Sequence, residues 1–435
     1  MSEIRRFEVK SLARVEGEGS LRVRVADGRV EIAEFSIYEP PRFFEKLVAG
    51  REVREIPDIV ARICGICPVA YQVTACLALE KALGVEVTPG IARLRRLLYY
   101  GEWIQSHGLH VHLLHMPDFF GVESGIALAA SRPDLVHRGL RLKEVGGRIM
   151  EVIGGRAVHP VNVAVGGFYK LPSADAVRRL VPDLEWAMAA SHDLVAEGSR
   201  FEFPGIPHDY DGVCLRPSEG YPVDHGAIVS TSGLVIEADD FDRHFSERHV
   251  PWSTALQSVM LPGETPYFVG PLARVNACHD RLPAATRRVV EACGIEWPLR
   301  RSSQSIVARA IEIAVACEES LAILREGVAG IGPCRVAWEP RVGSGSHATE
   351  APRGLLWHRY EIDGDGLVRH AVIVPPTSQN QARIEADLKA MLPGVLDLDD
   401  AAATLACERL IRDYDPCISC ATHFLRCVID RGSSA

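Results

Sequence analysis

Long apolar runs and a secretory leader are both missing from this 435-residue sequence. No window of about 18 or more uncharged apolar residues occurs, so no membrane span is expected. The opening MSEIRRFEVK lacks the apolar segment of a secretion signal, and a reducing cytoplasm is the expected compartment. Gly/Ser-rich linkers, low-complexity tracts and internal repeats are absent too. We therefore expect a single large domain over residues 1–435.

Nucleotide-binding motifs are missing as well. Neither a G-x-G-x-x-G in a strand–helix context nor a P-loop occurs, so nicotinamide is not expected to bind this chain. The formal net charge is −9 with both signs interleaved, which argues against nucleic-acid binding. Beyond two C-x-x-C pairs, the remaining cysteines are scattered singly and give no cluster for an iron–sulfur relay.

The periodicity of apolar residues predicts an α+β fold that is mainly helical, with β-hairpins near both ends. Apolar and polar residues alternate over 20–39 and over 355–376, each around an Asp-Gly turn. The second turn, residues 363–366, resembles part of a calcium loop but lacks the other ligands, and is interpreted as a turn. Helical periodicity covers residues 68–84, 91–116, 173–199 and 303–326.

The two C-x-x-C pairs are Cys64–Cys67 in RICGICP and Cys417–Cys420 in DPCISC. Each pair precedes or opens a predicted helix, whose N-terminus favours the thiolate form. Four thiolates suit zinc, an iron–sulfur centre or nickel. Structural zinc sites usually gather their cysteines within a short segment, whereas these pairs lie far apart. Spacing alone leaves open a structural zinc, a redox or catalytic metal, and two unrelated pairs.

The residues around the cysteines resemble the large subunit of nickel–iron hydrogenases. RICGICPVAYQ and DPCISCATH match the first and last cysteine motifs of that family, and ARVEGEGSL matches its N-terminal glutamate motif. Four more segments match in the same order: PRFFEKLVAGR (41–51), GGRAVHPVNVAVGGF (154–168), EAPRGLL (350–356) and VPPTSQN (374–380). The ATH and SQN sequences resemble most the soluble cytoplasmic group linked to NAD(P). The related subunit of respiratory complex I shares the fold but lacks the cysteines.

The resemblance implies reversible cleavage of H2 at a nickel–iron centre. It implies that Cys64 and Cys417 bind nickel terminally, while Cys67 and Cys420 bridge nickel to an iron carrying carbon monoxide and cyanide. Cys417 would then take the proton and pass it to Glu16. On its own, Glu16 would be interpreted as a solvated charge beside a hairpin.

Arg353 matches the family arginine that lies over the metal site and contacts a cyanide. Arginine suits this position because it stays protonated and presents a rigid fork of donors, although in isolation Arg353 reads as a surface residue. Pro352 and Thr377 match residues that line the diatomic ligands. Asp415 would orient Arg353, or else cap a helix that begins at Pro416.

Glu45 and His423 match the ligands of a structural Mg²⁺ that joins the two ends of the chain. Each alone reads as an ordinary helix residue, and histidine is an unusual magnesium ligand, so this assignment rests on the resemblance.

HGLHVHLLH places four histidines along one predicted helix: His107, His110, His112 and His115. On a regular helix His107, His110 and His115 cannot all share one narrow face. A satisfied core histidine is the ordinary interpretation of each. The resemblance favours roles beside the cysteines for His107 and His110.

The sequence departs from the family pattern at three positions. Tyr71 and Glu18 stand where many members have histidine, and Ser106 stands where many have aspartate. These departures leave the metal ligands intact but affect the hydrogen bonding expected around them.

The resemblance further implies a small subunit with iron–sulfur clusters, joined over an extensive apolar interface, and flavin- and NAD(P)-binding subunits. A non-catalytic, zinc-stapled scaffold of the same fold is the alternative. Many family members are cut after the residue matching His423. The tail that follows here, residues 424–435, is therefore either a processing extension or a retained terminus, and the strand-like composition of FLRCVID favours a retained, docked one.

Overall fold

The structure is a computed structural model, and it describes residues 4–10, 12–26, 29–40, 42–205, 207, 211–327 and 331–421. Within these residues the fold is α+β and mainly helical, as predicted. The α-helices are α1 (Phe44–Val48), α2 (Ile56–Val60), α3 (Pro68–Leu83), α4 (Pro89–Leu109), α5 (Met116–Phe119), α6 (Gly125–Ser131), α7 (Pro133–Gly154), α8 (Ala174–Arg178), α9 (Val181–Gly198), α10 (Phe241–His244), α11 (Pro271–Cys278), α12 (Ala284–Ala292), α13 (Ser305–Glu326), α14 (Pro376–Met391) and α15 (Asp400–Asp413).

Shorter helical segments connect these helices. A π-helix covers His110–His115 and continues α4 without a break. The 3₁₀ turns are Val53–Glu55, Ala61–Ile63, Ala238–Asp240, His279–Arg281, Ser302–Gln304, Leu392–Val395 and Ile418–Ala421.

The strands of the described residues form small antiparallel sheets. Their bounds are β1 (Ile4–Val9), β2 (Gly19–Ala26), β3 (Arg29–Ile37), β4 (Val163–Ala164), β5 (Gly167–Phe168), β6 (Val213–Arg216), β7 (Ala227–Ser230), β8 (Val235–Ile236), β9 (Phe245–His249), β10 (Leu256–Met260), β11 (Gly343–Ala351), β12 (Gly354–Ile362) and β13 (Val368–Val374). The sheet orders are β1-β2-β3, β4-β5, β6-β7-β8, β10-β9 and β11-β12-β13.

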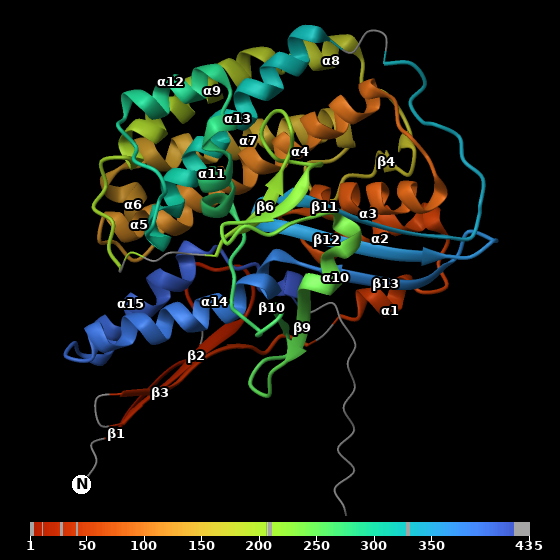
Figure 1. The fold of residues 1–435 in the computed structure, drawn as a ribbon. Helices are drawn as coiled ribbons and strands as arrows, with labels where there is room; N and C mark the ends of the chain where they lie inside the picture. Colours follow the sequence, from red (N-terminus) through yellow and green to blue (C-terminus); the bar gives the residue numbers. More distant parts are fainter. Residues whose placement is uncertain are drawn as a thin grey trace, which may run out of the picture.

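Helices α4, α7, α9 and α13 form one layer, and the β11-β12-β13 sheet lies beneath it (Figure 1). In the helical layer α4 packs against α7 and α13, and α13 packs against α9. The sheet contacts α3 so closely that a Cβ atom on Gly345 would lie 2.2 Å from the carbonyl oxygen of Ala78. The β1-β2-β3 sheet extends away from this body beside α14 and α15. The two halves of the sequence therefore meet between α3 and the sheet.

For three of the four segments predicted to be helical, the predicted start or end lies close to that of a helix in the structure. The helix predicted over 68–84 is α3, and Gly84 ends it with a positive φ of 65°. The helix predicted over 303–326 is α13, preceded by a 3₁₀ turn. The helix predicted over 91–116 begins as α4 but changes to the π-helix at His110.

The helical periodicity over 173–199 is confirmed, and the structure divides the segment into two helices, α8 and α9, separated by Arg179 and Leu180. Pro182 has no backbone N–H to continue the hydrogen-bond pattern of a preceding helix, and it sits in the first turn of α9.

Both predicted hairpins are present. Strands β2 and β3 pair from Gly19↔Ile37 to Ala26↔Arg29, while Asp27 and Gly28 lie outside the described residues. Strands β12 and β13 pair around 363–366, where the Asp363 carboxylate accepts hydrogen bonds from the Asp365 and Leu367 N–H groups. The structure adds the short strands β6 to β10, whose few residues gave too little alternation to be predicted.

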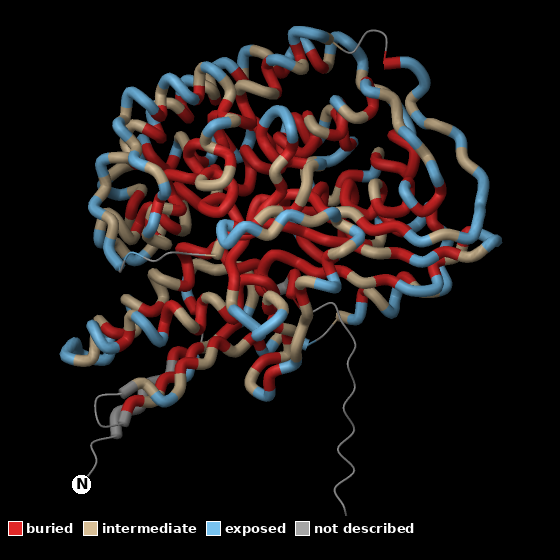
Figure 2. The backbone as a smooth tube through the Cα atoms, in the orientation of Figure 1, coloured by how far each residue is buried: buried red, intermediate tan, exposed pale blue. Residues whose placement is uncertain are grey.

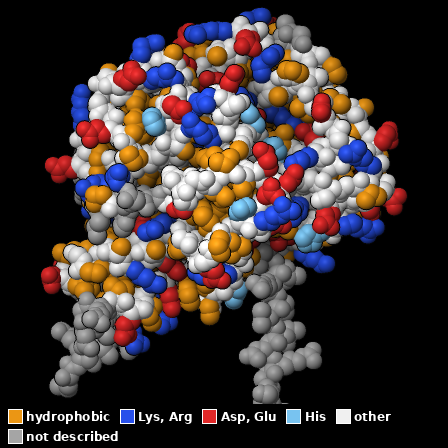
Figure 3. Space-filling view, in the orientation of Figure 1, with side chains coloured by type: hydrophobic (Ala, Val, Ile, Leu, Met, Phe, Trp, Pro, Cys, Tyr) orange, Lys and Arg blue, Asp and Glu red, His pale blue; other side chains and the backbone are white. Residues whose placement is uncertain are grey.

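The buried residues concentrate between the helical layer and the sheet (Figure 2). The main core cluster includes residues from both ends of the described chain, from Val9 to Ala421, and it contains all four C-x-x-C cysteines. On the face shown in Figure 3, acidic and basic side chains are interspersed. None of the helices in the described part of the chain is both long and apolar enough to cross a membrane.

Candidate metal centre

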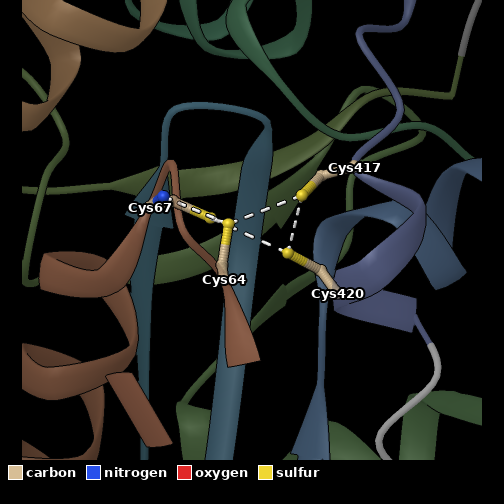
Figure 4. A group of neighbouring side chains, drawn as sticks. All are labelled: Cys64, Cys67, Cys417 and Cys420. Carbon is tan, nitrogen blue, oxygen red and sulfur yellow. Dashed lines mark hydrogen bonds between the residues drawn. The ribbon is translucent and has the colours of Figure 1, made fainter. Parts of the chain in front are cut away.

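The two C-x-x-C pairs meet in the core as a group of four sulfurs (Figure 4). The Sγ–Sγ distances are 2.8 Å for Cys64–Cys67, 2.9 Å for Cys417–Cys420, 3.4 Å for Cys64–Cys417 and 3.8 Å for Cys67–Cys420. All four sulfurs lie within 4.8 Å of one another, and all four residues are buried free cysteines. The interpretation of two unrelated pairs is therefore excluded.

The first pair is held by its own segment of chain. Cys64 follows the 3₁₀ turn Ala61–Ile63, and Cys67 is the N-cap residue of α3. The N–H groups of Ile66 and Cys67 donate to the Cys64 sulfur at 3.3 and 3.1 Å. Pro68 then starts the helix, where its missing N–H costs no hydrogen bond. Local backbone geometry thus points both sulfurs to the same side.

A buried carboxylate from α4 holds the start of α3. Both oxygens of Glu102 accept hydrogen bonds, from the N–H of Val69 at 2.6 Å and from the N–H of Ala70 at 3.1 Å. These donors are among those that a helix leaves unpaired at its N-terminus. Burial raises the pKa of Glu102 well above its usual range, although these N–H groups act in the opposite direction. Glu102 therefore fixes the helix that begins directly after Cys67.

The second pair is held by distant segments. The Cys417 N–H donates to Thr377 Oγ1 at 3.1 Å, and the Ile418 N–H donates to the backbone oxygen of Glu16 at 3.0 Å. The Cys417 thiol lies 3.1 Å from Oε2 of Glu16, to which it donates. After Cys417 the chain forms the 3₁₀ turn Ile418–Ala421, at whose end the described residues stop. The N-terminal glutamate motif and α14 thus complete this half of the centre.

Burial and mutual hydrogen bonding shift the pKa values of the four thiols in different directions. Burial raises the pKa of Cys67, Cys417 and Cys420 above the usual range. Burial also acts to raise the pKa of Cys64, but hydrogen bonds from the other three thiols and the charge of Arg353 lower it well below that range. Four sulfurs that compete for protons in a buried space are a donor set suited to a thiophilic metal, which replaces the protons.

Arg353 lies at the tip of the β11–β12 hairpin. Ala351 pairs with Gly354, so Pro352 and Arg353 form the two-residue turn. Arg353 donates from Nε to the backbone oxygen of Asp415 at 2.8 Å and from Nη2 to Asp415 Oδ1 at 3.0 Å. Burial acts to lower the pKa of Arg353, but Asp415 and the thiols raise it well above the usual range.

One donor group of Arg353 stays unused. Its Nη1 atom is buried and has no hydrogen-bond partner among the described residues. A buried guanidinium donor without an acceptor is costly, so this atom fits an acceptor bound at the metal. The four thiols and this donor together fit a metal that carries a hydrogen-bond-accepting ligand.

The π-helix changes how the histidines are arranged. A π-helix joins each residue by a backbone hydrogen bond to the residue five positions along, one more than in an α-helix. It brings the rings of His110 and His115 to a centroid distance of 5.3 Å, in an edge-to-face arrangement. A regular helix does not place two such residues side by side, which is why the sequence did not predict this pair.

The four histidines of this segment each have a hydrogen-bond partner, beginning with His107 and His110. His107 Nε2 lies 3.0 Å from Glu312 Oε2, and burial lowers the pKa of His107. His110 Nε2 lies 3.1 Å from the backbone oxygen of Arg412, and burial followed by the charge of Arg309 lowers the pKa of His110 well below its usual range.

The other two histidines of this segment also bond to neighbouring residues. His115 Nε2 lies 3.0 Å from Asp413 Oδ1, whereas His112 Nδ1 lies 3.0 Å from the backbone oxygen of Gly108. His110 and His115 thus hold the segment that leads to Cys417.

The predicted magnesium ligands are only partly described. Glu45 lies on α1 and its Oε1 accepts a hydrogen bond from the Ile373 N–H at 2.7 Å. Burial, with the nearby charge of Glu45, raises the pKa of Glu247 to about 8. His423 and the tail 424–435 lie outside the described residues, so their predictions stay untested.

The three departures from the family pattern have different environments. Tyr71 and Ser106 are buried, and their hydroxyl oxygens have no hydrogen-bond partner among the described residues. Burial raises the pKa of Tyr71 well above its usual range, and the charges of the four cysteines act in the same direction. Glu18 is exposed, and its N–H donates to Glu39 Oε1 at 2.8 Å. Tyr71 therefore lies near the four sulfurs.

Arg274 is a central residue that the sequence did not predict. Its guanidinium is fully buried on α11 and bonds to the carboxylates of Glu312 and Glu350. Glu312 also accepts from His107 and from Tyr221 at 2.9 Å. These partners lie far apart in the sequence, so the only local sign was a charged residue within an apolar helix.

Asp118 forms a second missed network. Its carboxylate accepts from Arg14 at 2.5 Å, from Arg412 at 2.9 Å through both oxygens, and from Arg409 at 3.4 Å. Arg412 also donates to the backbone oxygen of Ala13 at 3.2 Å. Asp118 thus joins the segment that carries Glu16 to the helix that leads to Cys417.

Known proteins with similar sequences share most of the length of this chain. Residues 42–134 and 263–423 match the family model described as nickel-dependent hydrogenase. The sulfhydrogenase 2 subunit alpha of Pyrococcus furiosus is 31% identical, over 97% of this chain and 99% of that protein. The NAD-reducing hydrogenase HoxS subunit beta of Cupriavidus necator is 28% identical, over 97% of this chain and 95% of that protein.

Solved structures agree with this relationship. A crystal structure of an NAD⁺-reducing NiFe hydrogenase in the H2-reduced state superposes with a TM-score of 0.87 at 27% identity, covering 96% of this chain and 99% of that one. A NiFeSe hydrogenase structure from Dm. baculatum shares the fold, with a TM-score of 0.78 at 22% identity. With the four-sulfur centre, the family match and these relatives in agreement, the chain belongs to the nickel-dependent hydrogenase family.

Proposed function

We propose that this chain is the catalytic large subunit of a nickel–iron hydrogenase, which cleaves H2 reversibly into protons and electrons. The observation that carries the proposal is the group of four buried sulfurs beside which lie the Glu16 carboxylate and an arginine, Arg353, whose Nη1 has no partner among the described residues. A zinc-stapled scaffold would need the sulfurs but would have no use for Glu16 against Cys417 or for the free Nη1 of Arg353.

In this proposal Cys64 and Cys417 would hold nickel, and Cys67 and Cys420 would hold nickel together with an iron whose other ligands are carbon monoxide and cyanide. When bound, the metal pair supplies the Lewis acidity that polarises H2. The cysteines exclude water from it, because each is at most 3% exposed. Exclusion of water strengthens every electrostatic interaction within the centre.

Cys417 and Glu16 form the proposed proton relay. The Cys417 thiol already donates to Glu16 Oε2 at 3.1 Å, so the proton moves along an existing hydrogen bond. The parallel bridge between the backbones of Glu16 and Cys417 fixes this distance. Glu16 is half-buried, and it can therefore pass the proton from the dry centre toward the surface.

Arg353, Pro352, Thr377 and Asp415 are proposed to shape the iron side. Asp415 holds two donor groups of Arg353 and leaves Nη1 for a cyanide. Thr377 accepts from the Cys417 N–H and would line the diatomic ligands together with Pro352. His107 and His110 are proposed to support this arrangement from α4 and the π-helix.

We also propose that Glu45 and His423 bind a structural Mg²⁺. The support from the described residues is that Glu45 lies against β13 through Ile373, directly before α14 and its Thr377. The ion would then join α1 to the end of the chain.

Electrons must leave through another subunit, since we infer no iron–sulfur cluster or nicotinamide site in this chain. We propose a partner small subunit with iron–sulfur clusters, followed by flavin- and NAD(P)-binding subunits, in a cytoplasmic complex. Support comes from the NAD-reducing hydrogenase among the relatives and from the NAD⁺-reducing enzyme among the similar structures. Residues 1–435 would form the single catalytic domain, with the tail 424–435 retained.

Metal analysis with infrared spectroscopy tests the proposal. The complex matured in its own cell should contain stoichiometric nickel and show infrared bands of metal-bound carbon monoxide and cyanide. Zinc in place of nickel, without such bands, would overturn the proposal in favour of the scaffold.

A further inference from the structure

We propose that Arg274 is a positioning residue that fixes the Pro352–Arg353 turn over the metal centre. The inference rests on the proposed function, because it concerns where Arg353 presents its free donor. Asp415 holds the side chain of Arg353, whereas Arg274 holds the backbone that carries it. Arg353 is thereby fixed at both ends.

Every donor of Arg274 is in use. A guanidinium has five N–H donors. Two of them bond to Glu312, at 2.6 and 2.7 Å, and one bonds to Glu350 at 2.9 Å. The remaining two reach consecutive backbone oxygens, those of Ala351 at 2.9 Å and Pro352 at 3.1 Å. These are the two carbonyl groups that directly precede Arg353.

The guanidinium itself cannot shift easily. The side chains of Arg274, Glu312 and Glu350 are all fully buried, so a displaced charge would lose its partners without gaining water. The guanidinium also lies over the ring of Trp103, with its carbon 4.7 Å from the ring centroid. Trp103 in turn donates to the backbone oxygen of Glu350 at 2.9 Å. The turn is therefore attached to a rigid support.

The N-cap residue of α11, Gly270, also lies against the turn. Gly270 has a φ of 125°, and a Cβ atom there would lie 2.9 Å from the backbone oxygen of Arg353. The N–H of the preceding residue, Val269, donates to Asn380 Oδ1 at 2.9 Å, and Asn380 Nδ2 donates to the Val269 backbone oxygen at 3.2 Å. Asn380 lies on α14, the same helix as Thr377. The segment before α11 thus links the Pro352–Arg353 turn to α14, whose Thr377 contacts Cys417.

Lysine cannot replace this arrangement. Its ammonium keeps the charge but offers three donors from a single point, which cannot bridge two carboxylates and two carbonyl groups. Arg274→Lys should therefore free the turn and displace the Nη1 donor of Arg353. Because small misplacements near a reacting centre can reduce rates about a hundredfold, we expect kcat to fall by about tenfold to a hundredfold.

The test is infrared spectroscopy of the matured complex with Arg274→Lys, compared with Arg95→Lys. Arg95 is a matched control because it is equally buried, forms a two-point pair with Glu80 and donates to one backbone oxygen, that of Ala164, away from the turn. We expect the cyanide bands to shift in Arg274→Lys and to stay in place in Arg95→Lys. Unshifted bands in Arg274→Lys, or equal shifts in both variants, would overturn the inference.

A milder variant covers the case in which Arg274→Lys does not fold. Glu350→Gln keeps the size of the side chain but weakens the bond to Nη1 of Arg274, and it should shift the cyanide bands in the same direction by less. Unshifted bands in Glu350→Gln would then decide against the inference. Absence of cyanide bands from the unmodified complex would instead contradict the proposed function, so the two failures are distinguishable.

Discussion

The two cysteine pairs of the centre are built in opposite ways. The sulfur of Cys64 takes hydrogen bonds from the next residues along the chain, and a single carboxylate, Glu102, holds the helix that follows. Cys417 instead depends on Thr377, 40 positions away, and on Glu16, 401 positions away. One half of the centre is therefore organised locally, whereas the other requires most of the fold. Contacts between such distant residues form late because closing long loops costs entropy.

The largest effect is expected from replacing Cys417, which is proposed both to bind nickel and to take up the proton. Cys417→Ala should abolish H2-dependent reduction and lower the nickel content, because it deletes a ligand and the proton acceptor together. Activity assays and metal analysis of the purified complex check this prediction. Cys407→Ala, a buried cysteine of α15, is the matched control and should keep its nickel. Turnover in Cys417→Ala would remove that cysteine from the mechanism.

Glu16→Gln should separate proton transfer from metal binding. Loss of a positioned acid or base typically slows a reaction by about 10² to 10⁴-fold, and exchange of H2 with D2O should slow by that order. Nickel content and infrared bands should stay unchanged, because the backbone of Glu16, rather than its carboxylate, pairs with Ile418. The exposed Glu18→Gln is the control. Unchanged exchange in Glu16→Gln would count against the relay.

Asp118→Asn should weaken the distant half selectively. The change removes the carboxylate that pairs with Arg14 and Arg412 and leaves Glu408, 3.6 Å from Arg412, as the remaining acidic neighbour. Breaking a buried ion pair costs about 3–5 kcal/mol. Hydrogen exchange should therefore speed up over residues 412–418 and around Glu16, while residues 64–70 stay protected. Equal loss of protection in both segments would show that the two halves are not independent.

Glu102→Gln should weaken the local half of the centre instead, and by less than Asp118→Asn weakens the distant half. The amide can accept only one of the two backbone hydrogen bonds, and one unpaired buried donor costs about 1–3 kcal/mol. Hydrogen exchange should increase at Val69 and Ala70 only. Gln105→Glu, an isosteric change one turn along α4, controls for altered charge on that helix. A matching increase over residues 412–418 would break the comparison.

The smallest expected effect is a pH dependence of stability that comes from Glu350, in the β11–β12 hairpin. Burial raises the pKa of Glu350 from 4.5 to about 7, so the folded chain binds more protons than the unfolded chain between these values. Stability from this group is therefore present below pH 4.5 and lost as the pH rises toward 7. Urea unfolding below and above this window should show the unmodified chain losing stability relative to Glu350→Gln. A constant difference would contradict the prediction.

The sequence predicted best what depends on neighbouring residues. The start of α3 at Pro68, its end at Gly84 and the turn at Asp363 follow from local backbone preferences. The local half of the centre belongs to this group. Its partner pair could be placed beside it only through the resemblance to a family, since spacing left three interpretations open.

What escaped prediction involves long-range pairing or a departure from regular periodicity. Arg274 meets Glu312 and Glu350 across 38 and 76 positions, and no local pattern signals such a pair. Asp118 meets Arg412 across 294 positions in the same way. The π-helix also escapes such a prediction, because the regular helical period of apolar residues does not reveal a turn that departs from it.

The π-helix has a consequence for how the protein can change its length. A π turn is equivalent to one residue inserted into an α-helix. Deleting a single residue between His110 and His115 would restore a regular helix, on which the two histidines would stand four positions apart and still be neighbours. The helix beyond them would keep its orientation, so His115 would still meet Asp413, and Asp118 its arginines. The segment thus absorbs one additional residue without disturbing the alignment of two distant parts of the chain, whereas the same insertion into a regular helix would rotate everything after it by about 100°.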